Sequence, residues 1–197
     1  MADNLGYTAG SGTTIAADDI SSVFYQRVKL SIGADGTAVD ASAAAPVPVY
    51  GVGVSASATF TPAASSHAAG DCNGAAGTFA FGALSGSVFM ITDAELEIDG
   101  ATAEATAWRL YLYNVTPPGA YADDAAWDLP SGDQASFLGY IDLGTAIDLG
   151  STQWVENHGV NKTVKLSGTG VFGYLVNLTT LTTAAVAHTV KLYGVPL

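Results

Sequence analysis

The sequence predicts a mainly β protein, with an extended N-terminal arm followed by an antiparallel β-sandwich of the jelly-roll kind. Short runs of residues alternate between apolar and polar, as expected of strands that bury one face. Gly, Pro, Asn and Asp separate these runs at the spacing of a sandwich or barrel. Helical periodicity is nearly absent, because the best stretch, residues 120–128, is short and runs into Pro130.

Residues 1–50 are predicted to form the arm. Residues 7–15 are rich in Gly, Ser and Thr, and they carry too little apolar surface to fold alone. Residues 16–22 are compatible with a short helical turn or with a loop. The arm is therefore expected to lack a core of its own.

One strand and a linker complete the predicted arm. The strand covers residues 24–30 and places Tyr25, Arg27 and Lys29 on one face. An Ala-rich stretch over 40–48 follows and ends in Pro-Val-Pro, which favours extended backbone. A semi-stiff linker is expected between the strand and the next domain.

Residues 51–197 are predicted to form the sandwich. Regular alternation begins in residues 52–60, and a loop of small residues over 62–77 comes next. The other strands are expected within residues 87–99, 107–113, 137–143, 164–166, 171–177 and 185–195.

Two of these strands show which side chains should face the core. The inward sets are predicted to be Ala94, Leu96 and Ile98 in one strand, and Trp108, Leu110 and Leu112 in the other. The outward sets are Glu95, Glu97 and Asp99, and Arg109, Tyr111 and Tyr113. The three carboxylates must face water, because they cannot all be buried in ionised form.

A small internal repeat lies in the second half of the chain. The sequence Ile-Asp-Leu-Gly occupies residues 141–144 and again residues 147–150. Two copies this short do not indicate a solenoid. We interpret them as a strand, a turn and a second strand.

The sequence gives little sign of catalytic or metal chemistry. None of His67, His158 and His188 stands at a chelating distance from another along the chain. Cys72 is the only cysteine and has no nearby base. Four aspartates within residues 122–133 fit no calcium-loop spacing, so a solvated acidic loop is favoured. No catalytic residue, metal ligand or cofactor is expected, and the protein is predicted not to be an enzyme.

The tryptophans are the best candidates for a binding role. Trp108 alternates in phase with apolar residues and is therefore assigned to the core. Trp127 and Trp154 lie in loops or at strand edges. They are predicted to pack in an interface between proteins or, alternatively, to stack against a glycan.

Charge and hydropathy exclude two classes of partner. The chain has 18 acidic and 6 basic residues, a net charge of -12, so nucleic acid should be repelled. No run reaches ~18 apolar residues, which excludes a transmembrane helix. The start of the sequence has neither a basic nor an apolar signal region. We expect synthesis in a cytoplasm, with no membrane association.

The N-terminal segment resembles the opening of a group of tailed-bacteriophage virion proteins. The resemblance rests on Thr8-Ala-Gly-Ser-Gly-Thr-Thr-Ile-Ala-Ala-Asp-Asp-Ile20, Tyr25-Gln-Arg-Val-Lys-Leu30 and Gly33-Ala-Asp-Gly-Thr-Ala38. Residues 137–197 are only loosely similar to β-sandwich domains of phage decoration proteins and head fibres. Similar openings precede different C-terminal domains, and the group offers no catalytic residues to carry over.

The resemblance implies a structural protein on the outer capsid surface of the virion. The working hypothesis is a decoration or cement protein that binds the major capsid protein and ties capsomers together. It should form a homo-oligomer, with a trimer favoured over a dimer. Tyr25, Arg27 and Lys29 are candidates for contacts with the shell or a neighbour. The alternatives are a head fibre or tail-associated component, a glycan-binding host-attachment module and, more weakly, a hydrolytic virion enzyme.

Overall fold

The structure is a computed structural model that describes residues 17–20, 23–26, 31–32, 39–40, 53–82 and 86–197. By its contacts the chain divides into two units, residues 1–49 and 50–197. The predicted organisation of residues 1–50 into an arm and a linker stays a prediction.

The first unit contains two short antiparallel strand pairs. Strand β1 (Ala17–Ile20) pairs with β2 (Val23–Gln26), and β3 (Ser31–Ile32) pairs with β4 (Val39–Asp40). The helical turn or loop considered for residues 16–22 is therefore wrong over β1, where pairing with β2 outweighs the weak local preference. The strand predicted over 24–30 is described as far as Gln26, and residues 27–30 lie outside the described part.

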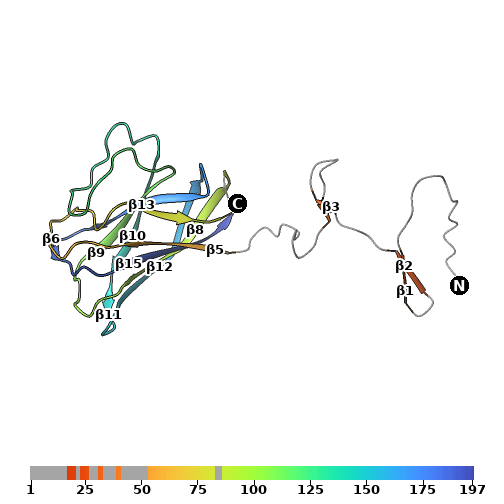
Figure 1. Ribbon diagram of the computed structural model, residues 1–197, viewed down its shortest axis with the longest axis horizontal. Coiled ribbons are helices and arrows are strands. Elements are labelled where there is room, and N and C mark those ends of the chain that lie inside the picture. The colour runs from red at the N-terminus through yellow and green to blue at the C-terminus, as the bar shows by residue number, and fades with distance from the viewer. Residues whose placement is uncertain (1–16, 21–22, 27–30, 33–38, 41–52, 83–85) are drawn as a thin grey trace. The chain divides into compact units, whose positions relative to one another are not determined.

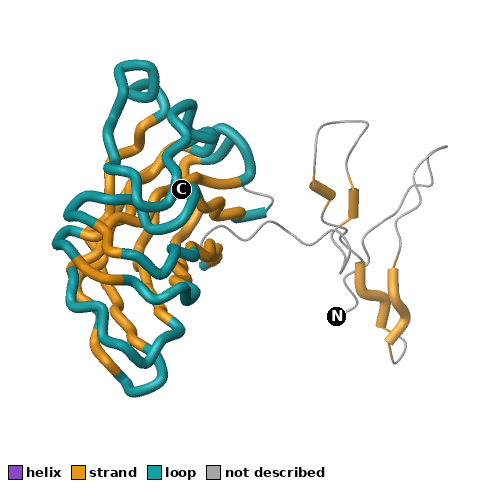
Figure 2. The backbone as a smooth tube through the Cα atoms, turned by 60° about the vertical axis from the view of Figure 1, so that its left-hand side comes forward, coloured by secondary structure: helices purple, strands orange, loops and turns teal. Residues whose placement is uncertain are grey.

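The second unit is an antiparallel β-sandwich (Figures 1 and 2). Its four-stranded sheet has the order β10 (Phe137–Thr145), β9 (Ala107–Tyr113), β13 (Gly170–Asn177) and β7 (Gly77–Ala80). Its five-stranded sheet has the order β11 (Ile147–Asp148), β12 (Gln153–Lys165), β8 (Val88–Ile98), β15 (His188–Pro196) and β5 (Val54–Phe60). A small pair joins β14 (Leu181–Thr182) to β6 (Ser66–His67).

The strand pairing confirms the jelly roll. When the two-residue β11 is set aside, the first strand of the sandwich pairs with the last. The second strand pairs with the second-to-last, and so on until the two middle strands pair with each other. The pairs are β5 with β15, β7 with β13, β8 with β12, and β9 with β10, all antiparallel. This is the arrangement that results when one long antiparallel hairpin is rolled into two facing sheets.

The core between the sheets follows the period-two pattern of the sequence. Trp108, Leu110 and Leu112 are fully buried, and so are Leu96 and Ile98. Glu97 and Asp99 are exposed and Glu95 is half-buried, as predicted for the outward set. Apolar side chains from both sheets fill the interior, among them Phe60, Phe79, Phe89, Ile91, Val171, Leu175, Val190 and Leu192.

A second apolar cluster lies on the outer face of the four-stranded sheet, beneath the loop of residues 114–136. Tyr113 and Tyr174 are buried in it, and Trp127 packs against it. Tyr113 thus lies on the outward face of the sheet, as predicted, and is buried there because the loop covers it. In Figure 1 this loop is drawn in green to teal between β9 and β10.

Backbone hydrogen bonds hold the covering loop to the loop before β7. The Cys72 amide donates to Ala125 O at 2.9 Å, and the Asp124 amide donates to Cys72 O at 2.9 Å. The Asp123 carboxylate accepts the amides of Ala63 and Gly74, at 2.7 and 2.6 Å. Residues 120–128, the best helical stretch of the sequence, thus form an irregular segment whose backbone groups pair with another loop.

The described part of the chain contains no helix long and apolar enough to cross a membrane. It also contains no group of three His, Cys, Asp or Glu side chains that is suited to hold a metal ion. Cys72 is buried, and burial raises the pKa of its thiol to about 12, so the thiolate that reacts with electrophiles is suppressed.

Candidate functional site

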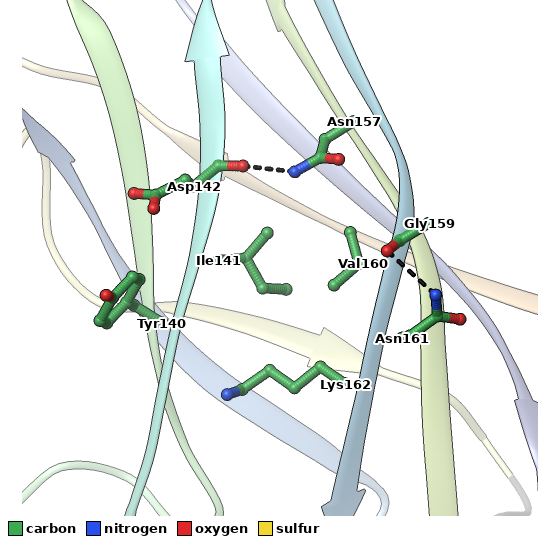
Figure 3. A pocket seen from close by; sticks show the side chains of 8 residues that line it. All are labelled: Tyr140, Ile141, Asp142, Asn157, Gly159, Val160, Asn161 and Lys162. Atoms are coloured by element: carbon green, nitrogen blue, oxygen red, sulfur yellow. Dashed lines mark hydrogen bonds between the residues drawn. The ribbon is translucent and has the colours of Figure 1, made fainter.

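A groove lies between β10 and β12 (Figure 3). Its volume of about 450 Å³ is within the range of ligand pockets. Strand β10 is at the edge of its sheet, and β11 pairs with β12 only at Gln153 and Trp154. The groove is lined by Tyr140, Ile141, Asp142, Asn157, Gly159, Val160, Asn161 and Lys162.

The groove has an apolar floor and polar walls. Ile141 and Val160 point toward each other between the two strands in Figure 3, and Ile141 is 3% exposed. At one end Asn157 Nδ2 donates to Asp142 O at 2.5 Å and ties β12 to β10. At the other end Lys162 extends from β12 toward β10.

An irregularity in β12 positions the polar wall. Its register with β8 shifts between His158 and Lys162. Gly159 has a φ of 81° and Asn161 a φ of 48°, and Asn161 Nδ2 donates to Gly159 O at 3.1 Å. Among residues with a side chain, Asn is one of the few that tolerates the left-handed region. A bulge of this kind re-aims side chains, and here it directs Lys162 across the groove.

A second irregularity in β10 makes room for Lys162. The register of β10 with β9 shifts between Phe137 and Gly139, and Gly139 has a φ of 86°. A Cβ at Gly139 would lie 2.9 Å from Lys162 Nζ, so any side chain there would displace the ammonium. Burial lowers the pKa of Lys162.

Aromatic rings extend from the groove over the outer face of the four-stranded sheet. Tyr140 is 48% exposed, and Arg109 Cζ lies 4.1 Å from its ring centre. Arg109 Nε donates to Asp142 Oδ1 at 2.6 Å, which raises the pKa of Arg109. Tyr111 follows with its ring centre 5.9 Å from that of Tyr140, and Trp127 stacks on Tyr111 at 3.5 Å.

Trp127 is therefore held by its own chain. Besides stacking on Tyr111, its indole N–H donates to Tyr113 Oη at 3.2 Å. The side chain is half-buried under these contacts. Its role in an interface between subunits stays a prediction.

Trp154 lies on the other sheet, at one end of a flat polar face. It stands opposite Glu97 in the register of β12 with β8, and its indole N–H donates to Glu156 Oε1 at 2.8 Å. His158 contacts Asp93 at 2.9 Å and Glu156 at 3.1 Å, and these hydrogen bonds raise the pKa of His158. The two tryptophans proposed from the sequence thus occupy different faces of the sandwich.

Two exposed apolar side chains lie close to Trp154. Ile147 is 68% exposed and Leu149 is 65% exposed, and Ile147 is the register partner of Trp154. We define the apolar corner as Ile147, Leu149 and Trp154. Clusters of exposed apolar side chains are typical of surfaces that contact another molecule.

The N-terminal candidates are only partly described. Tyr25 lies in β2, where its register partner is Asp18. Arg27 and Lys29 lie outside the described residues. The predicted contact of these three residues with a shell or neighbour stays a prediction.

The sequence interpretation missed the groove. It contains Lys162, Asn157 and Asn161, none of which was assigned a binding role from the sequence. Gly139, inside the strand predicted over 137–143, was the available signal, because a glycine within a strand indicates a bulge or a close approach.

The remaining histidines, His67 and His188, are buried. His188 is buried and its Nε2 lies 2.7 Å from Glu104 Oε2, which is also buried. His67 is buried beside Ser65, whose Oγ lies 3.2 Å from its Nε2.

No protein-family model and no curated protein sequence matches the chain. Among solved structures, it is similar to a chain of the native virion of Kashmir bee virus at acidic pH, with a TM-score of 0.26 and 12% identity over 98% of this chain and 93% of that one. The same virion at neutral pH gives a TM-score of 0.28, with 12% identity over 98% and 92%. At these TM-scores the similarity carries no argument about function.

Proposed function

We propose that this chain is a structural component of a tailed-bacteriophage particle, most specifically a decoration protein on the outer face of the capsid. It binds the major capsid protein, assembles with copies of itself and performs no catalysis. The proposal is supported by the combination of an N-terminal segment, residues 8–38, that resembles the opening of tailed-phage virion proteins with a jelly-roll sandwich.

The apolar corner supports an association role. Ile147 and Leu149 place large apolar side chains in water on a chain with a net charge of -12. Burying them in a contact removes apolar surface from water, at roughly 25 cal/mol per Å². We propose that this corner packs against a neighbouring subunit and that Trp154 anchors the contact.

The N-terminal segment supplies the second contact in this proposal. Its basic residues Arg27 and Lys29 are the only ones before Arg109. They pair with acidic groups on the shell, while Tyr25 on the same predicted face adds apolar area. Among the described residues, every side chain of the sandwich core belongs to residues 50–197, so a variant without residues 1–45 should keep this core.

Rebinding to stripped particles tests the proposal. Shells that lack the protein are mixed with the full chain, with a variant without residues 1–45, or with the double variant Ile147→Ser, Leu149→Ser. Bound protein is measured by sedimentation, and its position by a density map of the particle. The full chain should decorate the capsid surface, and both variants should bind at least tenfold less.

A matched control is Val115→Ser, which removes another exposed apolar side chain far along the sequence from the corner. It should bind like the full chain. Density on the tail or on fibres in place of the capsid surface would favour the head-fibre or tail-associated alternative. Full binding by the truncated variant would move the shell contact to the sandwich.

A further inference from the structure

Within the described residues, the β10–β12 groove contains a lysine without an ion pair, because the carboxylate in its lining, Asp142, is paired with Arg109. Of the chain's six basic residues, Arg109 is paired with Asp142 at 2.6 Å. Within the described residues Lys162 has no ion pair, and the lowering of its pKa by burial is opposed by no carboxylate. An ammonium that is partly withdrawn from water and unpaired is a site at which an anion is stabilised.

The position of this ammonium is built by the backbone of both strands. The bulge in β12 turns Lys162 toward β10, and Gly139 leaves empty the space that Lys162 Nζ approaches. A lysine on a regular outer strand face extends into solvent and keeps its rotamer freedom. Here two left-handed residues, Gly139 and Asn161, are needed to hold the side chain across the groove.

The other groove residues restrict the class of ligand. Ile141 and Val160 form an apolar floor, and the amides of Asn157 and Asn161 supply both donors and acceptors. A sugar ring combines an apolar C–H face with hydroxyl groups that donate and accept. A carboxylate on the sugar would meet Lys162 in a charge-assisted hydrogen bond.

Two other ligand classes fit less well. Nucleic acid is a polyanion, and a chain with a net charge of -12 repels it. An extended peptide would add to the edge of β10 or β12, but both strands carry register shifts in their ladders with β9 and β8, and such irregularities hinder regular strand addition.

We propose that the β10–β12 groove binds an acidic saccharide, with the sugar carboxylate on Lys162 Nζ and the hydroxyl groups on Asn157 and Asn161. This binding function goes beyond the structural role in the particle and does not depend on it. It differs from the glycan hypothesis drawn from the tryptophans, because neither Trp127 nor Trp154 lines the groove.

Calorimetry with trigalacturonate tests the proposal on the full chain. The fully methyl-esterified trisaccharide is the neutral control ligand. Binding of trigalacturonate should saturate at ligand concentrations up to about 10 mM. Such weak binding corresponds to a free energy of a few kcal/mol. The ester should bind at least about tenfold more weakly, because a hydrogen bond to a charged group contributes about 1.5–3 kcal/mol.

Variants locate the binding. Lys162→Gln should weaken trigalacturonate binding at least about tenfold. Lys165→Gln, an exposed lysine on the same strand, should change it less than twofold. Asn161→Gly suits the φ of 48°, so it removes the amide without straining the backbone and should weaken binding several-fold. Far-UV circular dichroism confirms that each variant is folded.

Three results would overturn the proposal. One is the absence of saturable trigalacturonate binding by the full chain. Another is binding of the ester with the same affinity as trigalacturonate, or a loss of affinity that is the same for Lys165→Gln and Lys162→Gln. Either outcome shows that the groove does not recognise the sugar carboxylate through Lys162. The third is tighter binding of pentaglutamate than of trigalacturonate, which assigns the groove to acidic peptides. None of these outcomes affects binding to capsids.

Discussion

The sequence Ile-Asp-Leu-Gly occurs twice within ten residues, and the two copies occupy opposite environments. In the copy within β10, Ile141 and Leu143 are each 3% exposed and belong to the main core. In the copy that begins β11, Ile147 is 68% exposed and Leu149 is 65% exposed. Both copies end in a left-handed glycine, with φ values of 99° at Gly144 and 101° at Gly150.

The difference between the copies arises from their neighbours. The copy in β10 pairs with β9 at Ile141, Asp142 and Gly144, and its apolar side chains belong to the core between the two sheets. The copy in β11 has β12 on one side for two residues, and in the described part of the chain no strand lies on the other. Local pattern sets which side chains share a face, whereas the layers around a strand decide whether that face is buried. An apolar face that stays exposed needs a partner outside the chain.

Shortening the apolar side chains should give the largest contrast between the copies. Ile141→Ala and Leu143→Ala should each lower the free energy of unfolding by about 2–5 kcal/mol, because each leaves a cavity in the core. Ile147→Ala and Leu149→Ala should each change it by less than about 0.5 kcal/mol. Urea unfolding of dilute protein measures all four, and equal losses from the two copies would contradict the contrast.

Replacing the glycines should give a smaller contrast. Gly144→Ala should cost about 2 kcal/mol and Gly150→Ala about 1 kcal/mol, because both force a side chain into the left-handed region. A Cβ at Gly144 would also meet Val155 Cγ2 at 3.4 Å, whereas a Cβ at Gly150 meets nothing within 4 Å. Thermal unfolding compares the two variants, and a larger loss at Gly150 would disprove this ranking.

Neutralising the aspartates should give the smallest effect. Asp142→Asn removes the ion pair with Arg109, whose side chain is 25% exposed while that of Asp142 is 56% exposed, so about 0–1 kcal/mol is expected. Asp148→Asn keeps an oxygen that can accept the Gly150 amide, at 2.8 Å from Asp148 Oδ1, and should be nearly neutral. The difference in unfolding free energy between Asp142→Asn and Asp148→Asn should vanish at 1 M salt, where the screening length for exposed charges is about 3 Å. A loss from Asp142→Asn that persists in salt would show another role for this carboxylate.

The regular strands could be predicted from the sequence because one face of each is buried by the opposite sheet. Leu96 and Ile98, or Leu110 and Leu112, stand two residues apart, and that period is a direct record of one-sided burial. The jelly-roll pairing of first strand with last was expected from fold class rather than from any residue. The positions of Trp108 in the core and Glu97 in water followed from the same alternation.

The groove and the second cluster could not be predicted in the same way. Tyr113 is buried because residues 114–136 fold back over it, and no periodic pattern in those residues records that contact. Lys162 reaches β10 because of register shifts in two strands, which depend on pairing with β8 and β9. Such shifts break the period-two pattern on which the assignment of faces depends.

The central position of β15 in the five-stranded sheet has a consequence for synthesis of the protein. Strand β15 lies between β8 and β5, and Val54 pairs with Gly194. One edge of β5 and one edge of β8 therefore stay unpaired while the ribosome makes the residues that precede β15. The sheet is completed only once β15 has emerged and paired with both strands. Folding dominated by such distant pairings is slow. A ribosome that stops before His188 would release a chain with two unpaired strand edges, a known route to aggregation.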